Sequence, residues 1–338
     1  MKRSAATPEA GGVGRSVFSA LRPLGRTHLI PVAVMLILGA VALVLPLLLS
    51  GYWIRVFTTI FMFAALAQSV NVIAGFAGYA DFGNILYFGL GAYVSGFAMQ
   101  HGLPAPAAIA LGSLFGATVA LTIGRPILRL RGHYFAIATI GMLEGTRELV
   151  TNLDFLGGGS GLNLPIVDLP PREFSGLMYY LMLATAAAIS ITALLVRRSS
   201  LGLGLRAIKG DEQAATVMGI NATRYKTAAW ALAAAGSGLV GGVYGLWRGF
   251  IEPGVAFDAV TGTQYFMMML LGGPGTIVGP ILGAFGLGLL DVLVWGQWQS
   301  GHLAILGGLI MATVIFLPDG FVNVLRRRTL PRPRRWSR

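Results

Sequence analysis

The sequence contains no cysteine and few charged residues, although it is 338 residues long. The absence of cysteine excludes disulfide bonds, thiolate chemistry and cysteine-ligated metals. The four histidines are dispersed and have no partners at metal-ligand spacing, which argues against a zinc site. The phosphate-binding pattern GxxxxGK[ST] is also absent, so the chain is not expected to bind nucleotide by itself in the usual way.

Apolar residues dominate what is present. Hydrophobic residues make up 55% of the chain and charged residues 11%, and the mean hydropathy is +0.73. Of the 25 basic residues, 21 lie in four segments, at 2–26, 125–131, 197–226 and 326–338. Lys and Arg stay on the cytoplasmic side of a membrane during insertion. Because apolar stretches separate the clusters, the net charge of +12 indicates membrane orientation and not nucleic-acid binding.

The apolar stretches predict an all-α, polytopic membrane helix bundle of about ten spans, with the N- and C-termini in the cytoplasm. A helix needs roughly 20 apolar residues to cross a bilayer. The predicted spans are 29–49, 56–74, two within 82–124 divided at 102–106, 134–151, 177–196, 227–247, 263–271, 278–295 and 303–317. The alternative is eight spans with re-entrant segments at 75–84 and 272–280, which also keeps both termini on one side.

These spans divide the chain into three parts. Residues 1–28 are predicted to be a disordered, basic cytoplasmic tail, and residues 326–338 a second basic tail. Residues 29–325 form the transmembrane domain, which includes a cytoplasmic loop at 197–226. The first apolar run has no small-residue cleavage site after its core, so it is expected to be a retained span and not a signal peptide.

The loop at 199–226 is predicted to contain a short helix. Asp211 and Glu212 favour a helix N-terminus, and Gly219 favours its end. A helix of about two turns is unstable alone, so something must hold it in place. It is either a surface helix bound by lipid phosphates or a docking helix for a soluble partner.

Five blocks of sequence carry a resemblance to a known family. The loop at 201–226 reads LGLGLRAIKGDEQAATVMGINATRYK. The other blocks are GFAGYADFGNILYFGLGAYV at 75–94, RLRGHYFAIATIGMLEGTRELV at 129–150, LGGGSGL at 156–162 and LLGGPGTIVGPILGA at 270–284. In this order, along most of the chain, they resemble permeases of branched-chain amino-acid ABC importers, the LivH/LivM family and in particular its LivM type, whose cytoplasmic loop is similar to 201–226.

The resemblance implies the permease subunit of an ATP-driven importer, multi-pass in the bacterial cytoplasmic (inner) membrane, and not an enzyme. Two partner ABC ATPase subunits would hold ATP–Mg and hydrolyse it, and the chain itself would bind no cofactor. The other implied partners are a second, LivH-type permease, membrane lipid and a periplasmic binding protein that delivers branched-chain or related hydrophobic amino acids. No nucleic acid is implied.

The resemblance also makes the loop helix the coupling helix that contacts the ATPase. The alanines would let the helix lie close in a groove of the ATPase, and Glu212 and Arg206 would supply polar contacts. The residues expected at this contact are Arg206, Asp211, Glu212, Ala214, Ala215 and Gly219.

Polar residues inside the spans are candidates for the translocation path. Glu144 lies about 15 Å along its helix and shares a face with Arg147. The two either contact the ammonium and carboxylate of an amino acid or form a neutralised pair that joins helices or subunits, and their mutual compensation favours the pair. The other candidates lie in glycine-rich breaks or mid-span, and they are Asn71, Asp81, Asn84, Gly272, Gly273 and Asp291. Each break either lines a cavity or is a tight helix crossing.

Three alternatives stand beside this interpretation. Sister permeases for urea and short amides share the same blocks, so a urea or short-amide permease of the family is the alternative substrate class. An ion- or proton-coupled secondary carrier should show more buried acidic residues and no structured docking loop. A membrane enzyme would need a convergent nucleophile, base or metal set, and the sequence shows none.

Overall fold

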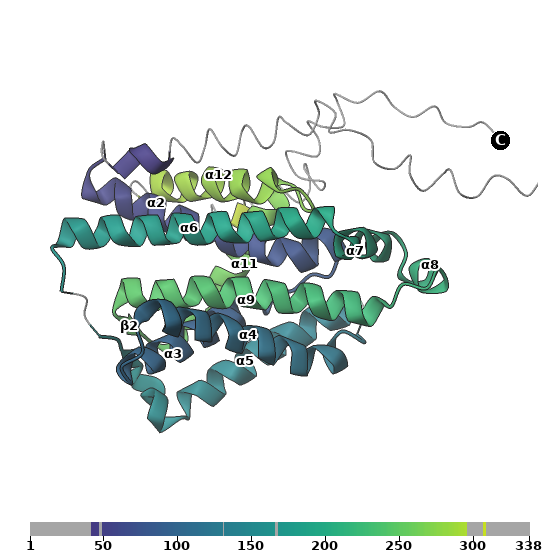
Figure 1. Cartoon of the computed structure of the whole chain (residues 1–338), viewed down its shortest axis with the longest axis horizontal. Coiled ribbons are helices and arrows are strands. Elements are labelled where there is room, and N and C mark those ends of the chain that lie inside the picture. The colour runs from purple at the N-terminus through teal and green to yellow at the C-terminus, as the bar shows by residue number, and fades with distance from the viewer. Residues whose placement is uncertain (1–41, 47–48, 131, 166–167, 296–306, 309–338) are drawn as a thin grey trace, which may run out of the picture. The chain divides into compact units, whose positions relative to one another are not determined.

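The computed structural model describes residues 42–46, 49–130, 132–165, 168–295 and 307–308. Internal contacts divide the chain into residues 1–45 and 46–338, and the elements named below belong to the second unit. That unit is a helix bundle, as predicted (Figure 1). The predicted tails at 1–28 and 326–338, and most of the predicted first and last spans, lie outside the described residues.

Long apolar runs form the main helices. They are α2 (Gly51–Val70) with its π-helical continuation η3 (Asn71–Gly75), α3 (Ile85–Gln100), α4 (Ala105–Ile127), α5 (His133–Thr151), α6 (Pro171–Arg198), α9 (Ala222–Arg248), α11 (Ala259–Gly272) and α12 (Val278–Trp295). Among the described residues, the stretches long and apolar enough to cross a membrane are Gly51–Gly75, Ala105–Gly124, Pro171–Arg198 and Ala222–Arg248. The helix bundle is confirmed, whereas the span count and the side on which the termini lie stay predictions.

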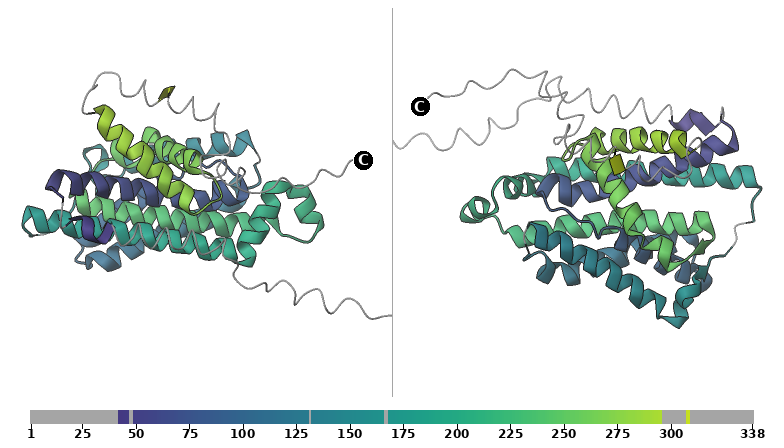
Figure 2. Two further views of the ribbon diagram at one scale, coloured as in Figure 1. Left: turned by 90° about the horizontal axis from the view of Figure 1, so that it is seen from above. Right: turned by 180° about the vertical axis from the view of Figure 1, so that it is seen from behind.

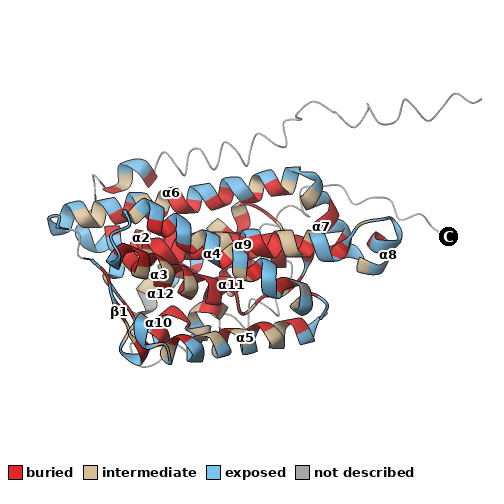
Figure 3. Cartoon of the chain, turned by 60° about the horizontal axis from the view of Figure 1, so that its bottom comes forward, coloured by how far each residue is buried: buried red, intermediate tan, exposed pale blue. Residues whose placement is uncertain are grey.

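Helix α9 forms the centre of the core, because its small residues let neighbouring helices come close. It packs along α3, α4 and α2, and most of its length is buried (Figure 3). A Cβ added at Gly91 of α3 would collide with the backbone carbonyl of Gly238, so these two helices touch backbone to backbone. Trp230 of α9 is fully buried and makes edge-on ring contacts with Tyr87 and Phe135.

Two glycine-rich breaks interrupt the helices where the sequence predicted them. The first is at 78–84, between the helix that continues η3 and α3, and the second is at 273–277, between α11 and α12. The second turns at Gly273 and Gly275 with φ angles of 124° and 80°, a region that glycine adopts readily. The second break touches the end of η3, since a Cβ added at Gly75 would lie 2.6 Å from the Gly275 nitrogen. This contact is a tight crossing, and a cavity-lining role of the breaks stays a prediction.

The two ends of the bundle differ. Helices α7 (Ser200–Gly210) and α8 (Glu212–Val217) lie at one end, here called the α8 end, in all the views of Figures 1 and 2. At the opposite β end, β1 (Leu162–Asn163) pairs antiparallel with β2 (Phe250–Ile251). Short helices η4 (Asp154–Leu156), η5 (Gly158–Ser160) and α10 (Pro253–Ala256) lie next to these strands in the sequence. The all-α expectation missed this strand pair, because two-residue strands leave no alternating pattern.

Candidate coupling site

The corner formed by α7, α8 and the start of α9 is built from side-chain caps. Ser199 accepts a hydrogen bond from the Gly202 N–H, and Asp211 accepts from the first turn of α8 at 2.8 and 3.1 Å. Asn221 caps α9 in the same way, and Gly219 links the two helices at a φ of +86°. Because caps of this kind satisfy helix N–H groups, they hold a helix as short as α8. The predicted short helix between Asp211 and Gly219 is confirmed as α8, and α7 before it was not foreseen.

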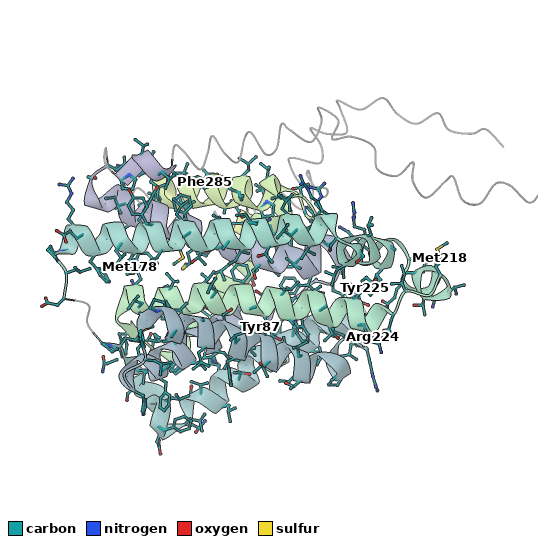
Figure 4. All side chains as sticks on the ribbon, viewed as in Figure 1. Tyr87, Met178, Met218, Arg224, Tyr225 and Phe285 are labelled. Carbon is teal, nitrogen blue, oxygen red and sulfur yellow. The ribbon has the colours of Figure 1, made fainter. Side chains whose placement is uncertain are left out.

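The tip of α8 is apolar and exposed. The side chains of Val217 and Met218 are 89% and 84% exposed, and Figure 4 shows Met218 at the outermost point of the corner. Two adjacent apolar side chains are rarely exposed to this extent unless another protein or a membrane covers them. These two residues were not among the predicted contact residues, although their adjacency at the helix C-terminus could have indicated them.

The inner side of α8 faces the chain's own bundle. Ala215 and Glu212 lie on this side, so they are not available for the predicted contact with the ATPase. Ala215 is buried, so it packs on the bundle and cannot lie in a groove of another protein. The carboxylate of Glu212 binds Lys226 and accepts a hydrogen bond from Tyr79, so it is directed inward as well. Of the predicted contact residues, the exposed ones are Arg206, Asp211, Ala214 and Gly219.

A buried lysine joins this corner to the bundle. The Lys226 ammonium donates to the Tyr79 hydroxyl at 2.9 Å, the Leu128 carbonyl at 3.0 Å and Glu212 at 2.9 Å. Its three N–H groups therefore have three acceptors, which is the condition for burying a charge at acceptable cost. Sequence reasoning missed this role, because a basic residue at the start of a span resembles an ordinary positive-inside anchor.

A second lysine reaches the first helix break from α7. The Lys209 ammonium donates to the carbonyl of Gly75 at 2.8 Å, at the end of η3. Its aliphatic stem passes Gly78, where an added Cβ would lie 3.1 Å from the Lys209 Cγ. Carbonyls at the end of a helix lack intrahelical partners, so a lysine there both neutralises and holds the break.

Helix η3, which precedes the first break, is hydrogen-bonded to the second break. The Asn71 side chain of η3 donates to the Thr276 carbonyl at 2.8 Å and accepts from the Gly275 N–H at 2.8 Å. One buried amide thus satisfies two backbone groups of the second break. Single turns of π-helix often mark functional positions, and here the π-helix is where the bonds to α7 and to the second break originate.

Asp81 and Asn84 lie in a buried polar cluster against α9. Asp81 accepts from the Trp230 indole N–H at 2.7 Å and from Asn84 at 3.4 Å. The Ser237 hydroxyl donates to Asn84 at 2.5 Å, and Ser69 donates to a carbonyl of α9 at 2.6 Å. No described residue hydrogen-bonds the second Asp81 oxygen, Oδ1. The structure therefore brings Asn71, Asp81 and Asn84 into one region next to the corner formed by α7, α8 and the start of α9.

Three path candidates lie on or next to α11 and α12. Gly272 ends α11, Gly273 begins the second break, to which Asn71 is bonded, and Asp291 is half-buried on α12. Glu144 and Arg147 form an ion pair of 2.9 Å along α5, in which each side chain is 41% exposed. The pair agrees with the predicted mutual compensation, and it is separate from the cluster around Asp81.

The family described as "Branched-chain amino acid transport system / permease component" matches residues 52–316. The chain therefore belongs to this family of transport permeases, which are not themselves enzymes. The predicted family and transport role are confirmed.

The relatives with curated names agree. The chain is 27% identical over 316 residues to the high-affinity branched-chain amino acid transport system permease protein LivM of Salmonella typhimurium, covering 85% of this chain and 73% of that protein. It is 23% identical over 288 residues to LivH of Escherichia coli, covering 77% and 91%. It is 26% identical over 248 residues to the autoinducer 2 import system permease protein LsrC of Enterobacter sp., covering 71% of each. No solved structure matches the chain.

Proposed function

We propose that this chain is the membrane-spanning permease subunit of an ATP-driven importer of branched-chain or related hydrophobic amino acids in the bacterial cytoplasmic membrane. Family membership and the names of the relatives support the transport role and this substrate class over urea or short amides. The apolar helices support the location. In this proposal the α8 end faces the cytoplasm, because the basic clusters at 125–131 and 197–226 flank it.

The division of α8 into two sides is the observation that carries the proposal. A docking helix must offer a surface to its partner and must also be fixed to the part that moves. Val217 and Met218 provide the surface, and the contacts of Glu212 with Lys226 and Tyr79 provide the attachment. A helix held only by lipid phosphates would need neither feature.

Hydrogen bonds connect α8 and α7 to the helix bundle, so a movement of either helix would be transmitted to the bundle. A movement of α8 would pull on Tyr79 through Glu212, and a movement of α7 would pull on Gly75 through Lys209. Asn71 would pass the displacement to the second break. For work to be transmitted, the ATPase must bind α8 differently in its two nucleotide states.

The proposed partners follow from what the chain lacks and exposes. It has no phosphate-binding loop, so two ATPase subunits would hold ATP–Mg and dock at the α8 tip. A second permease chain would complete the path. A periplasmic binding protein would deliver the solute at the β end, where Tyr244, Arg248, Phe250 and Glu252 line a cleft of about 170 Å³.

The proposal is tested by the double variant Val217→Asp with Met218→Asp in the transporter purified from its native operon. Burying an apolar side chain contributes about 1.5–3 kcal/mol, so ATPase recovery is expected to fall at least about tenfold. The control is Phe155→Asp, since the Phe155 side chain is also largely exposed, at 63%, but lies near the β end. Membrane insertion of both variants should be normal.

Two results would overturn the proposal. One is undiminished ATPase recovery and uptake in the Val217→Asp, Met218→Asp variant. The other is solute uptake driven by an ion gradient in vesicles that contain this chain alone, which would indicate a secondary carrier.

A further inference from the structure

Helix α5 carries an exposed side that is unlike a lipid-facing surface. Its buried side consists of Phe135, Thr139, Leu143 and Val150. The opposite side, here called the outer face of α5, follows the helical spacing of Tyr134, Ile137, Gly141, Gly145 and Glu148. In Figure 3, α5 shows exposed residues along the side turned away from α9.

Helix α4 provides the contrast. Its large exposed hydrophobic side chains are Leu111, Leu114, Phe115, Leu121 and Ile123. Residues 105–124 contain no Asp, Glu, Lys or Arg and meet the criteria for a membrane span, whereas α5 is not among the helices that do. The surface of α4 therefore suits lipid, and that of α5 suits protein.

The centre of the outer face of α5 has no side chains, because two glycines lie there. Bulky side chains precede this gap, towards the α8 end. A Cβ added at Gly141 or at Gly145 would meet no described atom within 4 Å. Tyr134 and Ile137, which precede the gap, are 75% and 67% exposed. A pair of glycines four residues apart lets another helix approach closely in a membrane.

Charged side chains at the same level of α5 as the two glycines indicate a protein neighbour. The half-exposed Glu144–Arg147 pair begins about 10 Å from the helix end at Thr151, and Glu148 adds a further negative charge. Charges at such depth are costly against lipid and usually face protein or a cavity. Arg147 lies within one turn of both carboxylates, so a neighbour with the same arrangement would be complementary.

We propose that the second permease chain of the transporter packs on the outer face of α5, and that this contact shields the Glu144–Arg147 pair from lipid. This inference rests on the proposed function. Two different permease proteins of the high-affinity branched-chain amino acid transport system, LivM and LivH of Escherichia coli, each match most of this chain. A partner of the same fold would bring its own α5 to the same level of the membrane.

Photo-crosslinking in the assembled transporter tests this contact. The chain has no cysteine, so Gly141→Cys introduces a unique thiol that can carry a benzophenone. The expected result is an adduct to the second permease chain, identified by mass spectrometry, at least about fivefold more abundant than from the matched control Leu114→Cys on α4. Adducts to lipid alone, or equal yields from both positions, would overturn the inference.

A second experiment does not depend on crosslinking. The double variant Gly141→Leu with Gly145→Leu fills the gap without meeting described atoms of its own chain and raises helix propensity. Recovery of the second permease is expected to fall about tenfold, while Gly176→Leu, at an equally open glycine of α6, leaves it unchanged. Normal recovery in the double variant would contradict the inference.

The two proposals fail separately. If the unaltered transporter retains its ATPases and takes up solute with ATP, but position 141 labels only lipid, the α5 contact is wrong and the function stands. If no ATPase accompanies the unaltered chain, the proposed function fails whatever the crosslink shows.

Discussion

Lys226 and Glu212 form an ion pair of 2.9 Å, and only 2% and 16% of their side chains are exposed. Tyr79 bonds both residues, with its hydroxyl donating to Glu212 and accepting from Lys226. The three residues come from α9, α8 and the first helix break. Helix α8 and the break are therefore held together by one buried contact.

Replacing the lysine should damage both stability and coupling. Lys226→Met leaves the Glu212 carboxylate without its cation, and breaking a buried pair from one side costs about 3–5 kcal/mol. The expected result is a lower melting temperature of the purified complex and fewer solute molecules taken up per ATP hydrolysed. Both quantities are measured in reconstituted vesicles.

The double variant Lys226→Met with Glu212→Leu separates the two effects. Removing both charges should recover most of the melting temperature, because no unpaired charge remains buried. Uptake per ATP should stay low, because the attachment to Tyr79 is also lost. Full recovery of uptake would show that the pair serves stability alone.

The Asn71 amide is expected to be needed for transport. Asn71→Leu conserves approximate size but leaves the Gly275 N–H and the Thr276 carbonyl unpaired, at about 1–3 kcal/mol for each buried group. Uptake should fall more than tenfold while ATPase subunits remain bound.

Asn71→Gln is the milder comparison, since it keeps the amide donor and acceptor on a side chain one methylene longer. Its uptake should lie between that of the unaltered chain and that of Asn71→Leu. Equal uptake by all three chains would contradict a role for this connection between the breaks.

Gly219→Pro should uncouple ATP hydrolysis from uptake. Gly219 has a φ of +86° and donates its N–H to Thr216, whereas proline is fixed near −65° and has no N–H. The turn between α8 and α9 must therefore rearrange, while the spanning helices should still insert.

Gly219→Ala is the milder control for this turn. It keeps the N–H and adds only the strain of a left-handed alanine, about 1–2 kcal/mol. Its coupling should be partly retained in an assay of uptake per ATP. Normal coupling in the proline variant would argue against α8 as the element that transmits force.

Charge reversal tests whether Glu144 and Arg147 act on each other. Glu144→Arg alone, or Arg147→Glu alone, places like charges three residues apart and should reduce uptake at least tenfold. The two changes together restore opposite charges and should recover at least about half of the uptake. A double variant as inactive as the singles would indicate that the two groups hold the substrate.

The sequence predicted the position of helix α8 but not its orientation. Asp211 and Gly219 are local signals, because a cap and a left-handed glycine act within a few residues. The inward direction of Glu212 depends on Lys226, fourteen residues later, and on Tyr79, which is far away in the chain. Exposure of Val217 and Met218 follows from that orientation and could not be derived from the loop alone.

The helix breaks also combine a feature that the local sequence predicts with a long-range contact that it does not. Glycine-rich runs at 75–84 and 272–275 predicted both interruptions, because glycine and proline end regular helices. Their contact through Asn71 and Gly275 joins positions 204 residues apart, and no local pattern encodes it. The Glu144–Arg147 pair was predictable, since its spacing within one helix is sufficient.

The backbone contact between Gly91 and Gly238 limits how this protein can move. Sliding α3 along α9 by one residue would drive a side chain into a space that holds only main-chain atoms. We therefore expect α3 and α9 to move as one rigid unit during transport. Any bending would then occur at the ends of this pair and in the helices around it.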